Sequence, residues 1–347
     1  MRSRNGSESP GLGLGSGWNG VGDADLVVGG GGELQAFWAG NRTTDTFDPL
    51  FGLNLATSTD GGGSWTLTPA SIYTKFFAYG RTPSVAVLNG VSIQTWYYIG
   101  EPAVHVGLDP NPDVALYSPP GTNENIAADP GSGQVWIAWC NGLEPQSGVG
   151  VWAQQVDPGS GSGMGSAVRM PGSPTSFEGA ERHLCPAASR TPFVARAGGG
   201  FFAATSAGYP GRDRVLVWRV GSGQPAVVVK KGSGGDPDYE VGLAADGSGR
   251  LWVAWVVFDS QGSPVLYVRR SNRAAAVWGE AVAVKPPSKQ IDFQNIDLAA
   301  QGDRLDVLKS LRTNAKGVAS IDLPAGTYKA VDSKAGYVSA STRVKAT

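Results

Sequence analysis

Short apolar runs separated by Gly-rich turns recur along the whole chain. Residues 125–129 read NIAAD, a GSG turn follows at 131–133, and residues 135–139 read VWIAW. Residues 243–255, LAADGSGRLWVAW, nearly repeat this unit. Runs of this length, rich in Val, Ile and Trp and bounded by Gly and Ser, predict β-strands joined by hairpin turns. The pattern therefore predicts an all-β chain.

The strand–turn–strand unit occurs six times. Its first strands are expected at residues 25–28, 83–87, 125–129, 193–196, 243–246 and 296–300. Repeats of roughly 40 to 70 residues with this content are typical of propellers with variable loops. We predict an all-β fold, a six-bladed β-propeller of four-stranded antiparallel blades.

Residues 58–65 have the sequence Ser-Thr-Asp-Gly-Gly-Gly-Ser-Trp. The aspartate can accept hydrogen bonds from its own turn, the glycines permit positive φ, and the tryptophan begins the next strand. Ser58, Asp60, Gly62 and Trp65 match the pattern Ser-x-Asp-x-Gly-x-x-Trp, and the stretch resembles the Asp-box, or BNR repeat, of sialidase-like β-propellers. The resemblance implies a structural turn between the third and fourth strands of a blade, remote from the channel where propellers bind ligands.

A second stretch keeps part of this pattern. Ser271 and Trp278 have the same spacing as Ser58 and Trp65, without the Asp and the Gly. They follow residues 265–268, a predicted third strand. We interpret the stretch as a degenerate Asp-box, and a chance Ser and Trp in a hairpin is the alternative.

The two ends of the chain differ from the repeat. Residues 1–22 are rich in Gly and Ser and lack the apolar run of a secretory signal, so we expect a flexible leader. Residues 23–312 hold the blades. Residues 313–347 predict two strands around a Pro-Ala-Gly break and resemble a segment of small carboxypeptidase-regulatory-like or Ig-like modules of exported bacterial proteins. About 35 residues are too few for a separate core, so we expect them to complete the sixth blade, with a module fragment as the alternative.

Composition excludes some classes of partner. The 347 residues are 41% hydrophobic and 16% charged, with a net charge of −1. A basic cluster for nucleic acid and an apolar run of about 18 residues for a membrane span are both missing from the sequence. We expect a secreted or cell-surface protein that is a monomer or a module of a larger assembly.

Cysteine and histidine usage bears on cross-links and metals. Cys140 and Cys185 could form one disulfide or remain as two buried thiols. Two His and two Cys can hardly furnish a four-ligand site without carboxylates, so no metal site is expected. The Asp-rich stretches 109–113 and 236–238 offer oxygen ligands for Ca²⁺, although Pro-stabilised turns explain them more simply.

Polar residues precede the first strand of every unit. Because the innermost strands of a propeller begin around one mouth of its channel, these residues should converge there. We predict a ligand site from Asp25, Arg81, Asn125, Arg190 and Asp238. Carboxylates with arginines suit hydroxyl-rich or carboxylated sugars. Ordinary loop composition is the alternative.

Resemblance to sialidases implies specific catalytic groups. In that family three arginines hold the substrate carboxylate, an Asp is the acid/base and a Tyr/Glu pair supplies the nucleophile. Arg81 and Arg190 stand in Arg-Thr-Pro segments that resemble the family's Arg-x-Pro element, but no such segment precedes the first unit. The arginine triad cannot be assembled from these residues.

We therefore rank binding of carbohydrate or another surface ligand above catalysis. An exo-glycosidase of sialidase type is one alternative, with Glu124, Glu240 and Asp297 as its candidate catalytic carboxylates. A structural or adhesive scaffold module of a larger cell-surface protein is the other.

Overall fold

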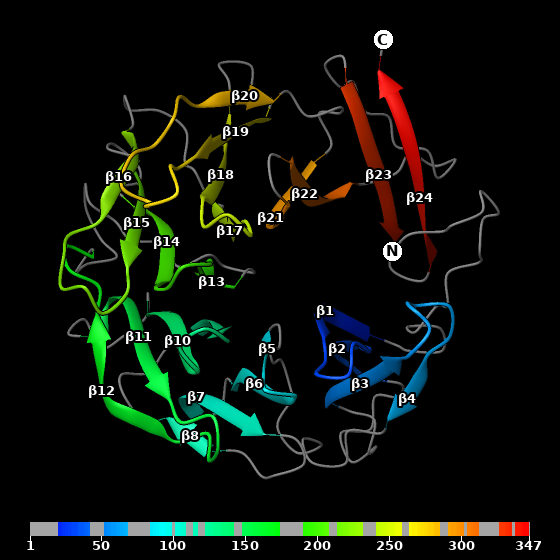
Figure 1. The fold of residues 1–347 in the computed structure, drawn as a ribbon, viewed down its shortest axis with the longest axis horizontal. Helices are drawn as coiled ribbons and strands as arrows, with labels where there is room; N and C mark the ends of the chain where they lie inside the picture. Colours follow the sequence, from blue (N-terminus) through cyan, green and yellow to red (C-terminus); the bar gives the residue numbers. More distant parts are fainter. Residues whose placement is uncertain are drawn as a thin grey trace.

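In the part of the chain that the structure describes, the secondary structure consists of 24 β-strands (Figure 1). The computed structural model describes residues 20–41, 52–68, 84–98, 101–108, 114–116, 122–141, 148–173, 190–207, 214–231, 241–258, 264–284, 291–301, 304–311, 326–334 and 337–346. The all-β prediction is thereby confirmed.

Within these residues, five antiparallel sheets have four strands each, joined in chain order. The first two sheets are β1 (Gly20–Val28), β2 (Leu34–Asn41), β3 (Gly52–Ser58), β4 (Thr66–Thr68), and β5 (Ser84–Leu88), β6 (Val91–Tyr98), β7 (Glu101–Leu108), β8 (Val114–Leu116). The third and fourth are β9 (Thr122–Asp129), β10 (Gln134–Asn141), β11 (Gly150–Val156), β12 (Gly163–Arg169), and β13 (Phe193–Ala195), β14 (Phe201–Ala207), β15 (Arg214–Arg219), β16 (Val227–Lys231). The fifth is β17 (Val241–Ala245), β18 (Leu251–Phe258), β19 (Pro264–Arg270), β20 (Val282–Val284).

Two hairpins follow the fifth sheet. They are β21 (Ile291–Gln301) with β22 (Arg304–Leu311), and β23 (Gly326–Lys334) with β24 (Tyr337–Ala346). The sheets stand around a ring with the first strand of each innermost, so the chain is a β-propeller (Figure 1). The prediction of six four-stranded blades is not met in the described residues, because each C-terminal hairpin pairs within itself. β1 also begins earlier than predicted, at Gly20.

Both faces of an inner sheet are apolar, and the third sheet shows why the ring forms. In β10, Val135, Ile137 and Trp139 pack against the second sheet, whereas Ala138 and Cys140 pack against the fourth. Trp139 is 0% exposed. Full burial of a large apolar side chain contributes about 1.5–3 kcal/mol, so a sheet with two such faces is stable only between two neighbours.

The turn at residues 58–65 joins β3 to β4, the position that the Asp-box resemblance implies. The Ser58 hydroxyl accepts a hydrogen bond from the Gly62 N–H and donates one to Asp60 Oδ1, both at 2.8 Å. Asp60 also accepts from the backbone N–H and the hydroxyl of Ser64, at 2.8 and 2.7 Å. These hydrogen bonds hold the pKa of Asp60 well below its usual range.

The second, degenerate stretch forms a comparable turn between β19 and β20. Ser271 and Trp278 pair in an isolated β-bridge. Asn272 Oδ1 accepts hydrogen bonds from the N–H groups of Ala276 and Val277, at 3.0 and 3.2 Å. An amide oxygen therefore organises this loop. Asn272 is one residue after Ser271, whereas Asp60 of the first turn is two residues after Ser58.

Strand direction gives the ring two different faces. Inner strands begin on one side, which we call the mouth face. The turns between first and second strands and between third and fourth strands lie on the opposite side, the turn face. Neighbouring turns there touch: a Cβ on Gly30 would lie 2.4 Å from the Cα of Gly90. Arg196 Nη1 likewise donates to the carbonyl of Gly249, at 3.4 Å.

We predict that Gly249→Ala destabilises the protein by about 1–3 kcal/mol, because φ is +84° there and the new Cβ would lie 2.5 Å from the Ala197 carbonyl. The matched variant Gly247→Ala has open space at its Cβ and should change stability by less than about 0.5 kcal/mol. Urea unfolding midpoints measure both. Equal effects of the two substitutions would contradict the close approach of the turns.

We predict that Asp60→Asn lowers the Tm at neutral pH, because the amide cannot accept every hydrogen bond made by the carboxylate. A lowered pKa in the folded state stabilises the protein above the unfolded pKa of about 3.9, and that contribution is lost as the pH falls further. The Tm difference from wild type should therefore hold above about pH 5 and narrow below about pH 4. Thr59→Ala, at the exposed neighbouring residue, is the control and should show no such pH dependence.

Candidate functional site

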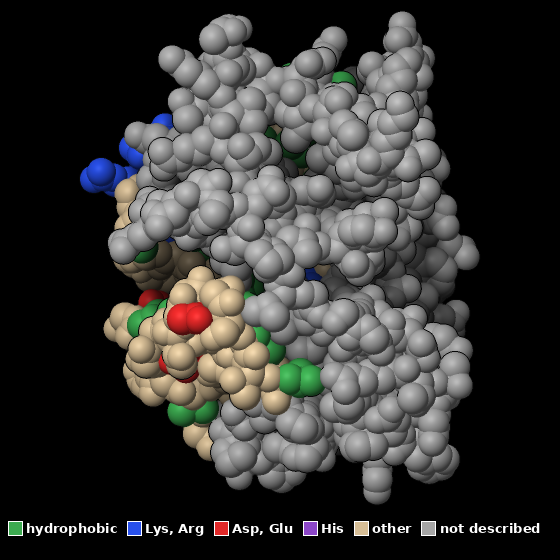
Figure 2. Space-filling model, turned by 90° about the vertical axis from the view of Figure 1, so that its right-hand side faces the viewer, with side chains coloured by type: hydrophobic (Ala, Val, Ile, Leu, Met, Phe, Trp, Pro, Cys, Tyr) green, Lys and Arg blue, Asp and Glu red, His purple; other side chains and the backbone are tan. Residues whose placement is uncertain are grey.

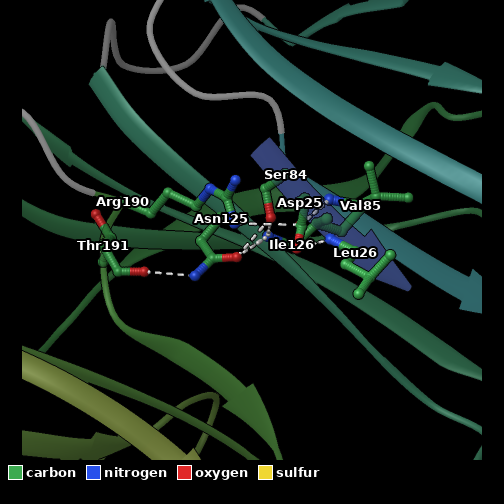
Figure 3. A network of polar contacts seen from close by, with 8 residues as sticks. All are labelled: Asp25, Leu26, Ser84, Val85, Asn125, Ile126, Arg190 and Thr191. Atoms are coloured by element: carbon green, nitrogen blue, oxygen red, sulfur yellow. Dashed lines mark hydrogen bonds and ion pairs between the residues drawn. The ribbon is translucent and has the colours of Figure 1, made fainter. Parts of the chain in front are cut away.

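Asp25 of β1 belongs to a network of polar contacts on the mouth face (Figure 3). Its Oδ2 forms an ion pair with Arg190 Nη1 at 3.2 Å and accepts the Val85 N–H at 2.8 Å. The Asp25 side chain is 21% exposed and that of Arg190 is 16% exposed. One carboxylate thus connects the first sheet to the start of β5 and to the segment that enters β13.

Asn125 of β9 continues these contacts across the mouth (Figure 3). Its Oδ1 accepts one hydrogen bond from the Ser84 hydroxyl at 2.6 Å and another from the N–H of the next residue, Ile126, at 2.9 Å. Its Nδ2 donates to the Thr191 carbonyl at 2.9 Å. Side chains and backbone from the first four sheets therefore meet in one polar network.

The network has a local cause in the strands themselves. Each innermost strand pairs with a partner on one edge, so its other edge presents backbone groups to the channel. Buried N–H groups need an acceptor, and Asp25 and Asn125 supply one to Val85 and Ile126. The same side chains that stabilise the ring therefore form the polar rim of its channel.

A cavity of about 450 Å³ extends behind this rim along the channel. Every lining side chain is apolar, and the lining comes from five inner strands: residues 85–87, 126–128, 193–195, 244–245 and 298–300. A cavity of this size is within the usual range for small-ligand sites. The described residues that line the channel therefore carry no charged side chain, whereas the mouth carries Asp25 and Arg190.

Glu124 is the candidate acid nearest to this network in sequence. It precedes Asn125 in β9 and is 1% exposed. Its side chain is therefore buried at the mouth end of the third sheet.

The structure brings together Asp25, Asn125 and Arg190 of the five predicted ligand-binding residues. Arg81, Asp238 and the candidate acid Glu240 lie outside the described residues, and for Asp297 only its backbone in β21 is described. Their roles stay predictions. Ser84 and Thr191 were missed, although Ser84 is the first residue of β5 and Thr191 lies two residues before β13.

Cys140 is disulfide-bonded, so the alternative of a free thiol at this position is wrong. The sequence has one other cysteine, Cys185, outside the described residues, and its pairing with Cys140 stays a prediction. In the part of the chain that the structure describes, no three or more His, Cys, Asp or Glu side chains gather as metal ligands. No helix in those residues is long and apolar enough to span a membrane.

Comparisons by sequence find no relative: no protein-family model matches the chain. No curated protein matches it either.

Solved structures do resemble the fold. A Dyadobacter fermentans protein of unknown function is 13% identical with a TM-score of 0.49, over 80% of this chain and 85% of the other. An endo-arabinase from Bacteroides thetaiotaomicron is 15% identical with a TM-score of 0.42, over 75% and 96%. A β-xylosidase/α-arabinofuranosidase from a compost microbial metagenome is 10% identical with a TM-score of 0.39, over 76% and 94%. Similarity this low transfers no activity, because one fold hosts many functions.

We predict that Asp25→Ala destabilises the protein by about 1–3 kcal/mol, since it removes the acceptor of the Val85 N–H and the partner of Arg190. Asp25→Asn keeps an oxygen for the backbone N–H and should cost less. Thermal unfolding of both variants measures the difference. Equal stability of wild type and Asp25→Ala would show that the network does not hold the first sheet to the ring.

Proposed function

We propose that this propeller binds a carbohydrate ligand at the mouth of its channel. The convergence of Asp25, Asn125 and Arg190, from three different sheets, beside a cavity of about 450 Å³ supports the proposal most directly. Sugar hydroxyls both donate and accept hydrogen bonds. A rim that combines a carboxylate, an amide and a guanidinium matches that chemistry.

Charge at the rim favours a neutral sugar over an acidic one. Asp25 already lies 3.2 Å from the Arg190 guanidinium and offsets its charge. A ligand carboxylate would have to compete with Asp25 for that guanidinium. The negative charge of Asp25 would also repel the ligand carboxylate. We therefore propose a neutral, hydroxyl-rich oligosaccharide end that hydrogen-bonds to the ion pair, with its less polar ring faces toward the apolar channel.

The finer features expected from the sequence belong to the same proposal. We propose an exported, sialidase-like propeller that acts outside the cell or at its surface without catalysis. We also propose six blades, with the two C-terminal hairpins together standing in the place of the sixth. The scaffold alternative differs from this proposal in requiring no ligand at the mouth.

Glycoside hydrolysis is the second candidate function, and the buried Glu124 is the observation that favours it. Such hydrolysis needs two carboxyl groups, one of them an acid whose proton the site controls. Asp25 and Glu124 come from the first and third sheets at the same end of the ring. A sialidase-type reaction would in addition need further arginines beside Arg190.

A glycan array and a panel of fluorogenic glycosides, both with the purified protein, test the two functions together. We predict binding of neutral oligosaccharides without turnover. Asn125→Ala and Arg190→Lys should each weaken binding about tenfold or more, since one lost hydrogen bond to a charged or buried group costs about 1.4 kcal/mol or more.

The control for this experiment is Ser160→Ala on the turn face, which should leave affinity unchanged. Near-UV circular dichroism checks that each variant is folded at the assay temperature. Unchanged affinity in folded Asn125→Ala and Arg190→Lys would reject the mouth as the site. Turnover that disappears in Glu124→Gln while binding persists would establish hydrolysis instead.

A further inference from the structure

The turn face has opposite charges on its two halves. We call the turns of the fourth and fifth sheets the basic half; these turns, residues 196–200, 219–226, 246–250 and 270–281, are all described. They carry five arginines and two acids: Arg196, Arg219, Arg250, Arg270 and Arg273 against Asp246 and Glu280. The turns of the first and third sheets form the acidic half. There the described turns carry Glu33, Asp60, Asp129 and Asp157, and no Lys or Arg.

These charges persist over a wide pH range. Turn hydrogen bonds lower the pKa of both Asp60 and Asp157, so these two carboxylates of the acidic half stay ionised in mild acid. In the basic half, Arg196 donates to the carbonyls of Gly199 and Arg273, which hold the guanidinium without neutralising it. Figure 2 views the rim beside the first sheet, with acidic side chains on that sheet and basic ones projecting above it at the left-hand edge.

Apolar side chains are exposed on the same face. Val28, at the end of β1, is 60% exposed, and Val91, at the start of β6, is 39% exposed. On the basic half, Val277 in the turn before β20 is 64% exposed and Val282 at its start is 62% exposed. Isolated exposed valines are ordinary, but these four all lie at the turn end of their strands. Exposed valines therefore accompany the charges on both halves: Val28 beside the acidic half, Val277 and Val282 on the basic half, and Val91 on the second sheet, between the first and third.

We infer that the turn face binds a second copy of this chain. In a face-to-face dimer, a two-fold axis along the border between the halves places the acidic half of each copy over the basic half of the other. The attraction between an acidic half and a basic half then occurs twice in one interface, because an isologous contact uses the same surface of both copies. The exposed valines of one copy meet those of its partner.

A second copy fits this face better than a polyanion does. A long acidic polymer on the arginines would run onto the carboxylates of the neighbouring half, where like charges repel it. It would also leave the valines exposed. The dimer leaves both channel mouths pointing outward, so the inference is independent of what the mouth binds.

Sedimentation velocity of the full chain tests the dimer. We predict a dimer at low ionic strength that dissociates as salt rises from about 0.05 M to about 0.5 M, because surface attractions are screened. We test two double variants, one on each half: Arg219→Glu with Arg273→Glu, and Glu33→Lys with Thr59→Lys. Each double variant should weaken self-association at least about tenfold. Mixing these two double variants should restore a dimer, because the turn face of the first variant is net negative and that of the second is net positive.

Lys230→Glu, at the mouth end of β16, is the matched charge change and should leave self-association unaltered. Monomers at every concentration in low salt would overturn the inference, and so would a dimer indifferent to both double variants. A monomer that binds a sulfated polysaccharide through the arginines would also overturn it and assign the basic half to a polyanion.

Discussion

Packing between sheets that are apolar on both faces is the constraint on which this structure depends. Successive residues of β10 face opposite neighbours: Ile137 packs toward the second sheet and Ala138 toward the fourth. A sheet of this kind cannot place either face in water, so every inner sheet needs two partners. A ring of sheets meets that requirement with short connections between sequential neighbours.

The ring creates a second requirement at its centre. Five inner strands turn one hydrogen-bonding edge toward the channel, and the N–H groups at their starts need acceptors. Asp25 and Asn125 meet this need for Val85 and Ile126, and Arg190 in turn pairs with Asp25. The polar residues that stabilise the ring at its mouth are thus also the residues that a ligand can contact. Stability and binding at the mouth are therefore coupled, and variants there must be judged on both.

Local patterns predicted the parts of the fold that depend on short stretches of chain. The turn at Asp60 follows from its own sequence, because a carboxylate and a hydroxyl two residues before it satisfy the turn's donors. The start of each inner strand could be read in the same way, and it led to Asp25, Asn125 and Arg190.

Which of these residues would touch could not be predicted, since the Asp25–Arg190 contact depends on how the first and fourth sheets are placed around the ring. Ser84 was missed because a serine at the start of a strand is common. Its role arises only from its contact with Asn125 across the channel. Whether the two C-terminal hairpins join into a sixth blade stays a prediction, because strand propensity cannot decide whether two hairpins form one sheet.

A crystal structure of the protein soaked with the neutral oligosaccharide that binds best would test the central claim most directly. We predict that the sugar lies over the mouth, with hydroxyls in hydrogen-bonding distance of Asp25, Asn125 and Arg190. A sugar bound elsewhere, with the mouth network unchanged and unoccupied, would contradict the account and leave the polar rim with a structural role alone.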